Sequence, residues 1–271
     1  MKFAPVLLRF LGLVFCGTAV LTALAAQEPD RRPTESAFIY YAAGQDFTLG
    51  SPSRRAIFSA ESVRGEGIPL ERGGIVNTGA GTFLEIQLVP SGAVIKLAGN
   101  TSFVYNGIDE NGRFADLRLL YGRMRVVTGR TSAAERDFLN GIHSIVIRAG
   151  EISARITEGD MGADYILVPG GADSSLHPLF SLYSFRGSAE VFTYGQERTG
   201  SNSSPIRRLT AQKGESLVLD ISAALIFAER MPVSGEIVNY WSFHNFAGSP
   251  PIPMPDTAIA GISNNPASSE R

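Results

Sequence analysis

Three carboxylates lie close together in the sequence, at Glu158, Asp160 and Asp164. Paired carboxylates perform the acid–base and nucleophilic steps of glycoside hydrolysis, so this group is compatible with a polysaccharide-cleaving enzyme. The surface loops of any acidic protein have the same composition, however, and nothing else near these residues indicates catalysis. We therefore expect no catalytic residue and no enzyme activity, and we rank the polysaccharide-cleaving alternative third among the functions considered below.

Residues that could hold a metal ion or a phosphate are scattered. His143, His177 and His244 are far apart, and none has a second histidine or a cysteine at metal-ligand spacing. The run at residues 109–112, Asp-Glu-Asn-Gly, matches part of a calcium loop but lacks the later ligands, which favours a hairpin tip. Neither a Gly-x-Ser-x-Gly elbow nor a phosphate-binding glycine loop is present. We expect no metal and no cofactor.

The first 26 residues have the composition of a secretory signal peptide. Two basic residues, Lys2 and Arg9, accompany an apolar run over residues 10–24, and small residues follow before Gln27. We expect cleavage near Ala26, no transmembrane segment in the mature chain, and a periplasmic or cell-surface location in a bacterium; a retained anchor stays open. Cys16 follows bulky Phe15, which argues against lipidation.

Cleavage would leave 22 basic and 26 acidic residues, a balance that does not attract nucleic acid. The nearest approach to a basic stripe consists of Arg118, Arg123, Arg125 and Arg130. These arginines alternate with apolar residues, as the solvent-exposed face of a strand would. We therefore expect no nucleic-acid partner.

Alternation with a period of two residues runs through the chain. Leu84, Ile86 and Leu88 fall on one face of a predicted strand, and Glu85 and Gln87 fall on the other. Similar strands are predicted at residues 82–88, 93–97, 102–105, 116–119, 123–127, 144–147, 151–156 and 190–194. Many short strands, with no helix of any length to interrupt them before about residue 220, predict an all-β fold.

Turn residues separate these strands. Asn-Gly pairs at 106–107 and 111–112 supply the positive φ angles of tight turns, and Pro-Ser-Gly at 90–92 suits a reversal. Gly122 is predicted to separate two strands. The polar run at residues 100–102, Asn-Thr-Ser, reads as a corner whose side chains bond the turning backbone.

The order of these pieces resembles the FecR domain family. The likeness rests on residues 71–88, with Thr-Gly-Ala-Gly at 78–81, then on 90–97, the corner at 100–102, and the strand–glycine–strand step at 117–126. It covers residues 37–220. The resemblance implies two facing sheets in a β-solenoid-like roll or sandwich, acting as a binding or scaffold module in envelope signalling or assembly. The sigma-factor-binding segment of the iron-citrate signalling members has no counterpart here, so a direct anti-sigma role is not expected.

Residues 221–248 form a C-terminal extension with a predicted short helix, capped by Ser234. Its aromatic residues are Tyr240, Trp241, Phe243 and Phe246. Two interpretations are open: the helix covers an open end or face of the β domain, or its aromatic group docks a protein partner, since such groups form interface hot spots. Residues 249–271 are predicted to be disordered.

The sequence therefore predicts a non-enzymatic, extracytoplasmic module that contacts an unidentified envelope protein through a strand edge or the aromatic group. The alternative is a module that binds cell-wall or surface glycans by stacking Tyr40, Tyr41 and Tyr105 on sugar rings.

Overall fold

The computed structural model describes residues 36–51, 54–63, 67–89, 91–108, 114–128, 144–169, 176–194, 207–221 and 226–247. The elements in chain order are β1 (Ser36–Ala43), β2 (Asp46–Gly50), β3 (Arg55–Ser59), the 3-10 turn η1 (Ala60–Ser62), β4 (Ile68–Leu70), β5 (Gly74–Thr78), β6 (Phe83–Val89), β7 (Val94–Leu97), β8 (Ser102–Ile108), β9 (Phe114–Val127), β10 (Ser144–Ala149), β11 (Ile152–Pro169), β12 (Leu176–Thr193), β13 (Arg207–Ala211), β14 (Glu215–Asp220), β15 (Phe227–Pro232) and the helix α3 (Gly235–Phe243). The predicted hairpin tip at 109–112, His143, the signal peptide and residues 249–271 lie outside the described residues.

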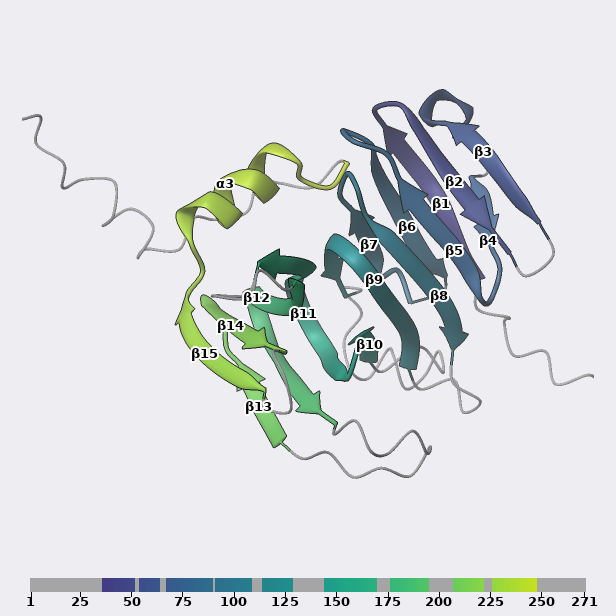
Figure 1. The fold of residues 1–271 in the computed structure, drawn as a ribbon. Coiled ribbons are helices and arrows are strands. Elements are labelled where there is room, and N and C mark those ends of the chain that lie inside the picture. Colours follow the sequence, from purple (N-terminus) through teal and green to yellow (C-terminus); the bar gives the residue numbers. More distant parts are fainter. Residues whose placement is uncertain are drawn as a thin grey trace, which may run out of the picture. The chain divides into compact units, whose positions relative to one another are not determined.

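The strands form one mixed, 15-stranded hydrogen-bonded sheet (Figure 1). The pairing divides it into two rows. The first row runs β4-β1-β6-β7-β9-β11-β12-β14-β15. The second row runs β3-β2-β5-β8-β9-β10-β11-β12-β13. The all-β prediction is therefore confirmed, with one short helix among the described residues.

Three long strands, β9, β11 and β12, belong to both rows because each bends in its middle. In β9 the bend is at Gly122, where φ is +101° and an added Cβ would lie 2.6 Å from the Thr101 Oγ1 atom. Only glycine fits this backbone at that approach. The prediction that Gly122 separates two strands is wrong, since hydrogen bonding continues through it. The Asn-Gly turn predicted at 106–107 is also wrong: it lies inside β8, at a bulge against β9.

The corner predicted at residues 100–102 is confirmed. Asn100 has a φ of 54° between β7 and β8, and the Thr101 Oγ1 atom accepts a hydrogen bond from the Arg123 backbone N–H at 3.1 Å. The reversal between β6 and β7 uses Gly92 with a φ of 68°, as the turn at 90–92 predicts. The turn at Asn100 and the hydrogen bond to Thr101 fix where the chain passes from β7 in the first row to β8 in the second.

One apolar cluster contains inward side chains from both rows, so the rows share a core. Leu84, Ile86 and Leu88 belong to it, as their alternation predicts. The opposite face of the predicted strands was expected to be solvated, and this is wrong at three positions, since Glu85 is 0% exposed and Lys96 and Arg125 are also buried. All three lie beneath the C-terminal part of the chain.

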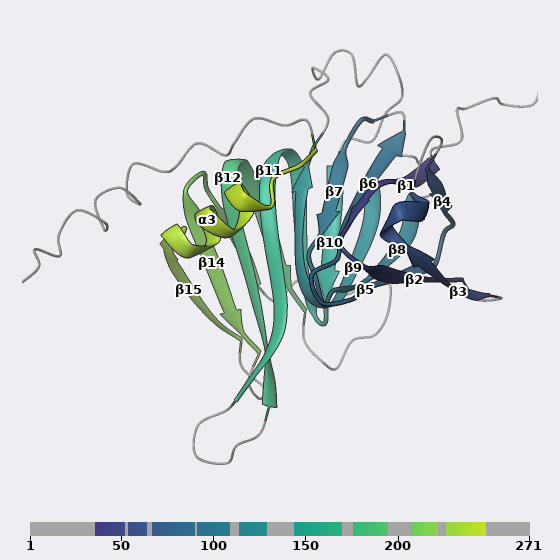
Figure 2. The ribbon, with the colours of Figure 1, turned by 90° about the horizontal axis from the view of Figure 1, so that it is seen from above.

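The C-terminal extension contributes an edge strand as well as a helix. β15 pairs antiparallel with β14, and α3 follows after two residues. Figures 1 and 2 both show α3 beside β11, β12 and β14. Within the described ranges, no helix has the length and apolar composition needed to span a membrane.

Candidate functional site

The helix α3 is fixed to the sheet by a cap and two buried side chains. The Ser234 Oγ atom accepts a hydrogen bond from the Ile237 N–H at 3.2 Å, which satisfies one of the free amides of the first turn. Val238 and Trp241 are both fully buried and pack in a separate apolar cluster with Ala98 and Phe185. The helix therefore covers the outer face of the first row, as one of the two interpretations predicts.

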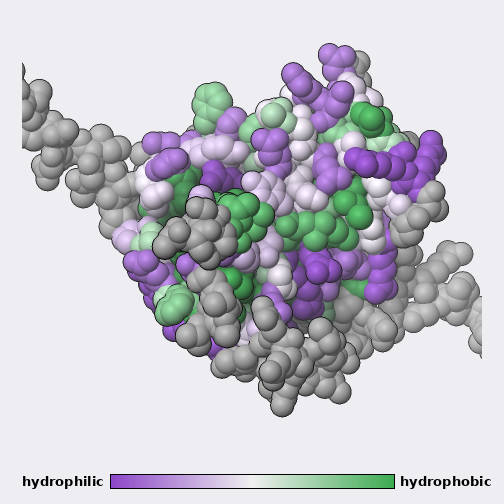
Figure 3. All heavy atoms as spheres, viewed as in Figure 1, coloured by the Kyte–Doolittle hydropathy of each residue, from purple (hydrophilic) through white to green (hydrophobic). Residues whose placement is uncertain are grey.

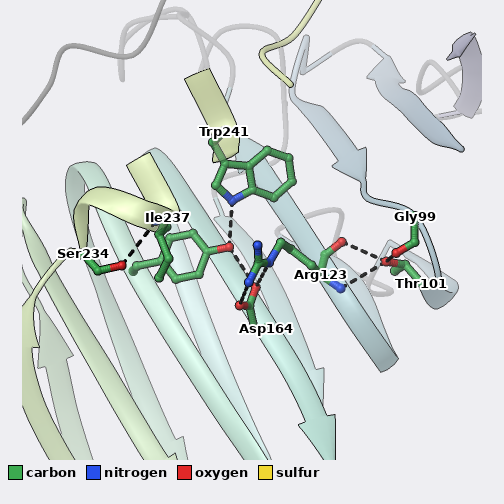
Figure 4. A network of polar contacts seen from close by, with 8 residues as sticks. Gly99, Thr101, Arg123, Asp164, Ser234, Ile237 and Trp241 are labelled. Atoms are coloured by element: carbon green, nitrogen blue, oxygen red, sulfur yellow. Dashed lines mark hydrogen bonds and ion pairs between the residues drawn. The ribbon is translucent and has the colours of Figure 1, made fainter. Parts of the chain in front are cut away.

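Trp241 ends a chain of buried polar contacts (Figure 4). Its Nε1–H donates to the Tyr183 hydroxyl at 2.8 Å, and that hydroxyl donates to Asp164 Oδ1 at 2.9 Å. The Arg123 guanidinium donates to both oxygens of Asp164, at 2.8 and 2.6 Å. Burial, with the neighbouring Asp164 carboxylate, raises the pKa of Tyr183 well above its ordinary value. The tyrosine thus stays a neutral donor between the helix and the ion pair.

Gly162 makes room for this tyrosine. Tyr183 lies opposite Gly162 in the β11–β12 pairing, and a Cβ added at Gly162 would lie 1.8 Å from Tyr183 Cε2. The ring therefore crosses the neighbouring strand where a side chain would stand, which is a common reason for a glycine inside a strand.

A second polar group crosses neighbouring strands of the first row. Lys96 Nζ lies 3.0 Å from Glu85 Oε1, and Arg125 donates to both oxygens of Asp160, at 2.8 and 2.7 Å. Tyr40 donates to Glu85 Oε2 at 2.7 Å. Burial lowers the pKa of Lys96, with nearby Arg125 acting in the same direction and Glu85 opposing it. Burial and Glu85 raise the pKa of Tyr40.

Residues 244–247, which we name the strap, continue from α3 across this group. Lys96 Nζ donates to the Asn245 carbonyl oxygen at 2.5 Å, and the Ala247 N–H donates to Glu85 Oε1 at 2.8 Å. Arg125 Nη1 donates to the Asn245 side-chain oxygen at 3.0 Å. The His244 ring stacks on Phe83 with 4.1 Å between centroids. The strap is therefore held mainly by charged side chains of the sheet.

The four predicted partner-binding aromatic residues differ in their exposure to solvent. Trp241 is 0% exposed and Phe246 is 5% exposed, Tyr240 is partly buried, and Phe243 is 85% exposed. Trp241 and Phe246 thus serve the cover in this structure, and Phe243 alone projects into solvent. The docking role of the set stays a prediction. Figure 3 shows hydrophobic and hydrophilic residues interspersed over one face of the molecule.

The acidic group Glu158, Asp160 and Asp164 does not converge on one point. Asp160 and Asp164 each bind a different arginine of β9 in a bidentate ion pair. Glu158 instead lines a shallow hollow of about 760 Å³ near the bends of β11 and β12, together with Arg155, Arg186 and Lys213. The three carboxylates are close together in the sequence, but the sheet directs their side chains to different neighbours.

The histidines and tyrosines considered from the sequence are also dispersed. His177 Nε2 lies 3.3 Å from Asp220 Oδ1, and His244 belongs to the strap. In the described part of the chain, no group of three or more His, Cys, Asp or Glu residues could hold a metal ion. Of the tyrosines that the glycan-binding alternative would stack on sugars, Tyr105 is buried in the core, Tyr40 donates to Glu85, and Tyr41 is 38% exposed.

One further hollow, of about 350 Å³, is lined by residues of β2 to β5 and of the segments beside them, among them Leu49, Phe58, Ile68, Arg54 and Glu71. It lies at the end of the sheet where β3 and β4 form the edges of the two rows. Its lining is mostly apolar with two charged residues, Arg54 and Glu71, and it holds none of the candidate site residues named from the sequence.

Comparison with known proteins provides no sequence match that would establish the family of this chain. No protein-family model matches the chain, and no curated protein matches it in sequence. Two solved structures from Parabacteroides distasonis, each provisionally described as an anti-sigma factor, are similar at 12% and 11% identity, with TM-scores of 0.41 and 0.42. In both cases 62% of this chain is covered, and it spans 63% and 64% of the length of those proteins.

Sequence reasoning missed the ionic residues beneath the cover. Glu85, Lys96 and Arg125 each occupy the outer face of an alternating strand, where a charge is ordinary. The feature that marks them as a group is strand pairing, since Glu85 is opposite Lys96 and Lys96 is opposite Arg125. That register cannot be read from the strands separately.

Proposed function

We propose that this chain is an exported, non-enzymatic FecR-like binding or scaffold module that contacts a protein partner in envelope signalling or assembly. Support comes from the strand and turn order of residues 71–126, which resembles that family, and from the all-β fold. The observation that carries the proposal is Phe243, a large aromatic side chain that is 85% exposed at the end of an anchored helix.

The Phe243 ring has an edge contact with the His244 ring, with 4.8 Å between centroids, and most of its surface is left exposed. Its helix is already fixed by the Ser234 cap and by the buried Trp241, whose Nε1–H donates to Tyr183. A partner therefore gains the burial of a whole aromatic ring without having to order the helix first. Rigidly presented aromatic side chains of this kind dominate binding energy at protein interfaces.

The test is capture of partners from a bacterial envelope fraction by the purified chain. We expect Phe243→Ala to reduce the captured protein at least tenfold, since hot-spot truncations cost about 2 kcal/mol or more. Asn239→Ala, which alters another exposed residue of α3, is the matched control and should capture normally. Full capture by the Phe243→Ala variant would refute the role of this side chain. Co-sedimentation with wall polymer that requires Phe243 would assign a glycan ligand instead.

A further inference from the structure

The strap is recognised largely through its backbone. Lys96 Nζ binds the carbonyl of Asn245, and Glu85 Oε1 binds the N–H of Ala247, two residues later. Main-chain groups of this kind are present in any extended segment, whatever its side chains. Glu85 and Lys96 therefore form a bracket that fits a peptide backbone, and this mode of recognition is common where proteins bind extended peptides.

The charges of this face are matched within the sheet. Glu85 pairs with Lys96, Arg125 with Asp160, and Arg123 with Asp164, each across neighbouring strands. None of these ion pairs involves the helix or the strap. They persist when the strap leaves, and the uncovered face carries no net charge from these six residues. A contact needed only for stability is served as well by apolar side chains.

Two side chains of the strap make contacts that would favour particular residues in a bound peptide. The Asn245 side-chain oxygen accepts from Arg125 Nη1 at 3.0 Å. The Phe246 ring lies 4.8 Å from the Arg125 guanidinium and 5.8 Å from Lys96 Nζ, within the range of cation–π attraction. The site thus selects an amide followed directly by an aromatic ring.

We propose that the face formed by Glu85, Lys96 and Arg125 is a peptide-binding site, occupied here by the chain's own strap. Its ligand in trans is an extended, uncharged segment of a partner protein in which an asparagine precedes an aromatic residue. The partner segment displaces residues 244–247, so the strap acts as an autoinhibitory cover. This inference rests on the proposed function, because it names the chemistry of the protein partner.

The probe is a labelled peptide with the sequence of residues 240–247, capped at both ends, and the readout is fluorescence anisotropy with the full chain. Asn245→Ala in the protein removes the Arg125 contact and weakens the strap in cis. We expect this variant to bind the peptide about tenfold more tightly than the wild type, since a hydrogen bond to a charged group is lost only in the cis complex. Asn239→Ala, the same substitution at an exposed position of α3, should bind like the wild type.

A change in the peptide avoids the risk that a protein variant fails to fold. A peptide with alanine in place of its asparagine should bind the Asn245→Ala protein about tenfold more weakly than the natural peptide does. Equal binding of the two peptides, or equal binding of the natural peptide by all three proteins, would overturn the proposal. So would a dimer of the Asn245→Ala variant in analytical ultracentrifugation, because a second copy would then be the occupant.

Failure of this inference is distinguishable from failure of the proposed function. Capture of an envelope protein that excess peptide does not compete away would overturn the peptide site and leave the binding function standing. Peptide binding selective for the Asn245→Ala protein, with no protein captured from the envelope, would support the peptide site and refute the proposed function.

Discussion

Breaking the ion pair between Glu85 and Lys96 tests the reasoning about the covered face most directly. The two side chains lie 3.0 Å apart and are almost completely excluded from solvent, with exposures of 0% and 4%. Glu85→Gln preserves the shape of the side chain but removes its charge. Lys96 then stands buried beside Arg125, with the Asn245 carbonyl as a remaining partner.

The expected loss is large because one charge is left uncompensated. Removing one member of a buried pair costs about 3–5 kcal/mol. For a domain of this size each kcal/mol lowers the melting temperature by about 2–4 °C, so Glu85→Gln should lower it by roughly 6–20 °C. Lys96→Met should be milder, since Glu85 keeps its donors Tyr40 and Ala247.

The double variant, Glu85→Gln with Lys96→Met, isolates the interaction energy between the two side chains. With both charges gone, no buried ion remains unpaired, and we expect a loss of only about 1–2 kcal/mol. Urea unfolding followed by circular dichroism measures the three free energies. Trp241, the only tryptophan, reports the covered face separately through its fluorescence. Additive losses below about 1 kcal/mol for each single variant would show that water reaches this pair and would refute the reasoning.

Three further outcomes follow from the same face. Gly162→Ala places a Cβ 1.8 Å from Tyr183 Cε2, and we expect a loss of about 3 kcal/mol with a shift in Trp241 emission. Because Tyr40 and Tyr183 have raised pKa values, unfolded tyrosines ionise first as pH rises above about 10, so the urea midpoint of unfolding should fall there. The lowered pKa of Lys96 raises stability with pH instead, but only up to about pH 10.4. Burial and nearby Lys96 lower the pKa of His244, so as pH falls below about 6.5 the unfolded strap gains a proton first. The hydrogen-exchange protection factors of residues 244–247, corrected for the intrinsic exchange rate at each pH, should therefore decrease.

The strands were predictable because alternation is a local signal. Residues 83–89 alternate in the sequence, and their apolar side chains enter the core as the period of two requires. The bends of β9, β11 and β12 were less predictable, since a glycine that ends a strand and a glycine that bends one look alike in the sequence. At Gly122 the decision depends on Thr101, which approaches from another turn of the chain.

The candidate site was half predictable. The Ser234 cap and the aromatic helix are local features and were found. Which aromatic side chains face inward could not be predicted, because Trp241 is held inward by a hydrogen bond to Tyr183, 58 positions earlier in the chain. Likewise, Glu85 and Arg125 carry charges typical of an exposed face, and the strap, which returns to them from much later in the chain, helps to bury them. Long-range contacts of this kind leave no mark on the spacing of either segment.

The division of the apolar side chains into two clusters bears on how the cover can move. Trp241 and Val238 pack with Tyr183 and Phe185, on the face of the first row opposite the shared core. Displacement of residues 244–247 alone therefore leaves both this smaller cluster and the contacts between the rows in place. Local opening of such a unit requires less free energy than global unfolding. A partner segment that replaces the strap's hydrogen bonds has to supply only that smaller difference, which makes the exchange of one segment for another energetically accessible at this face.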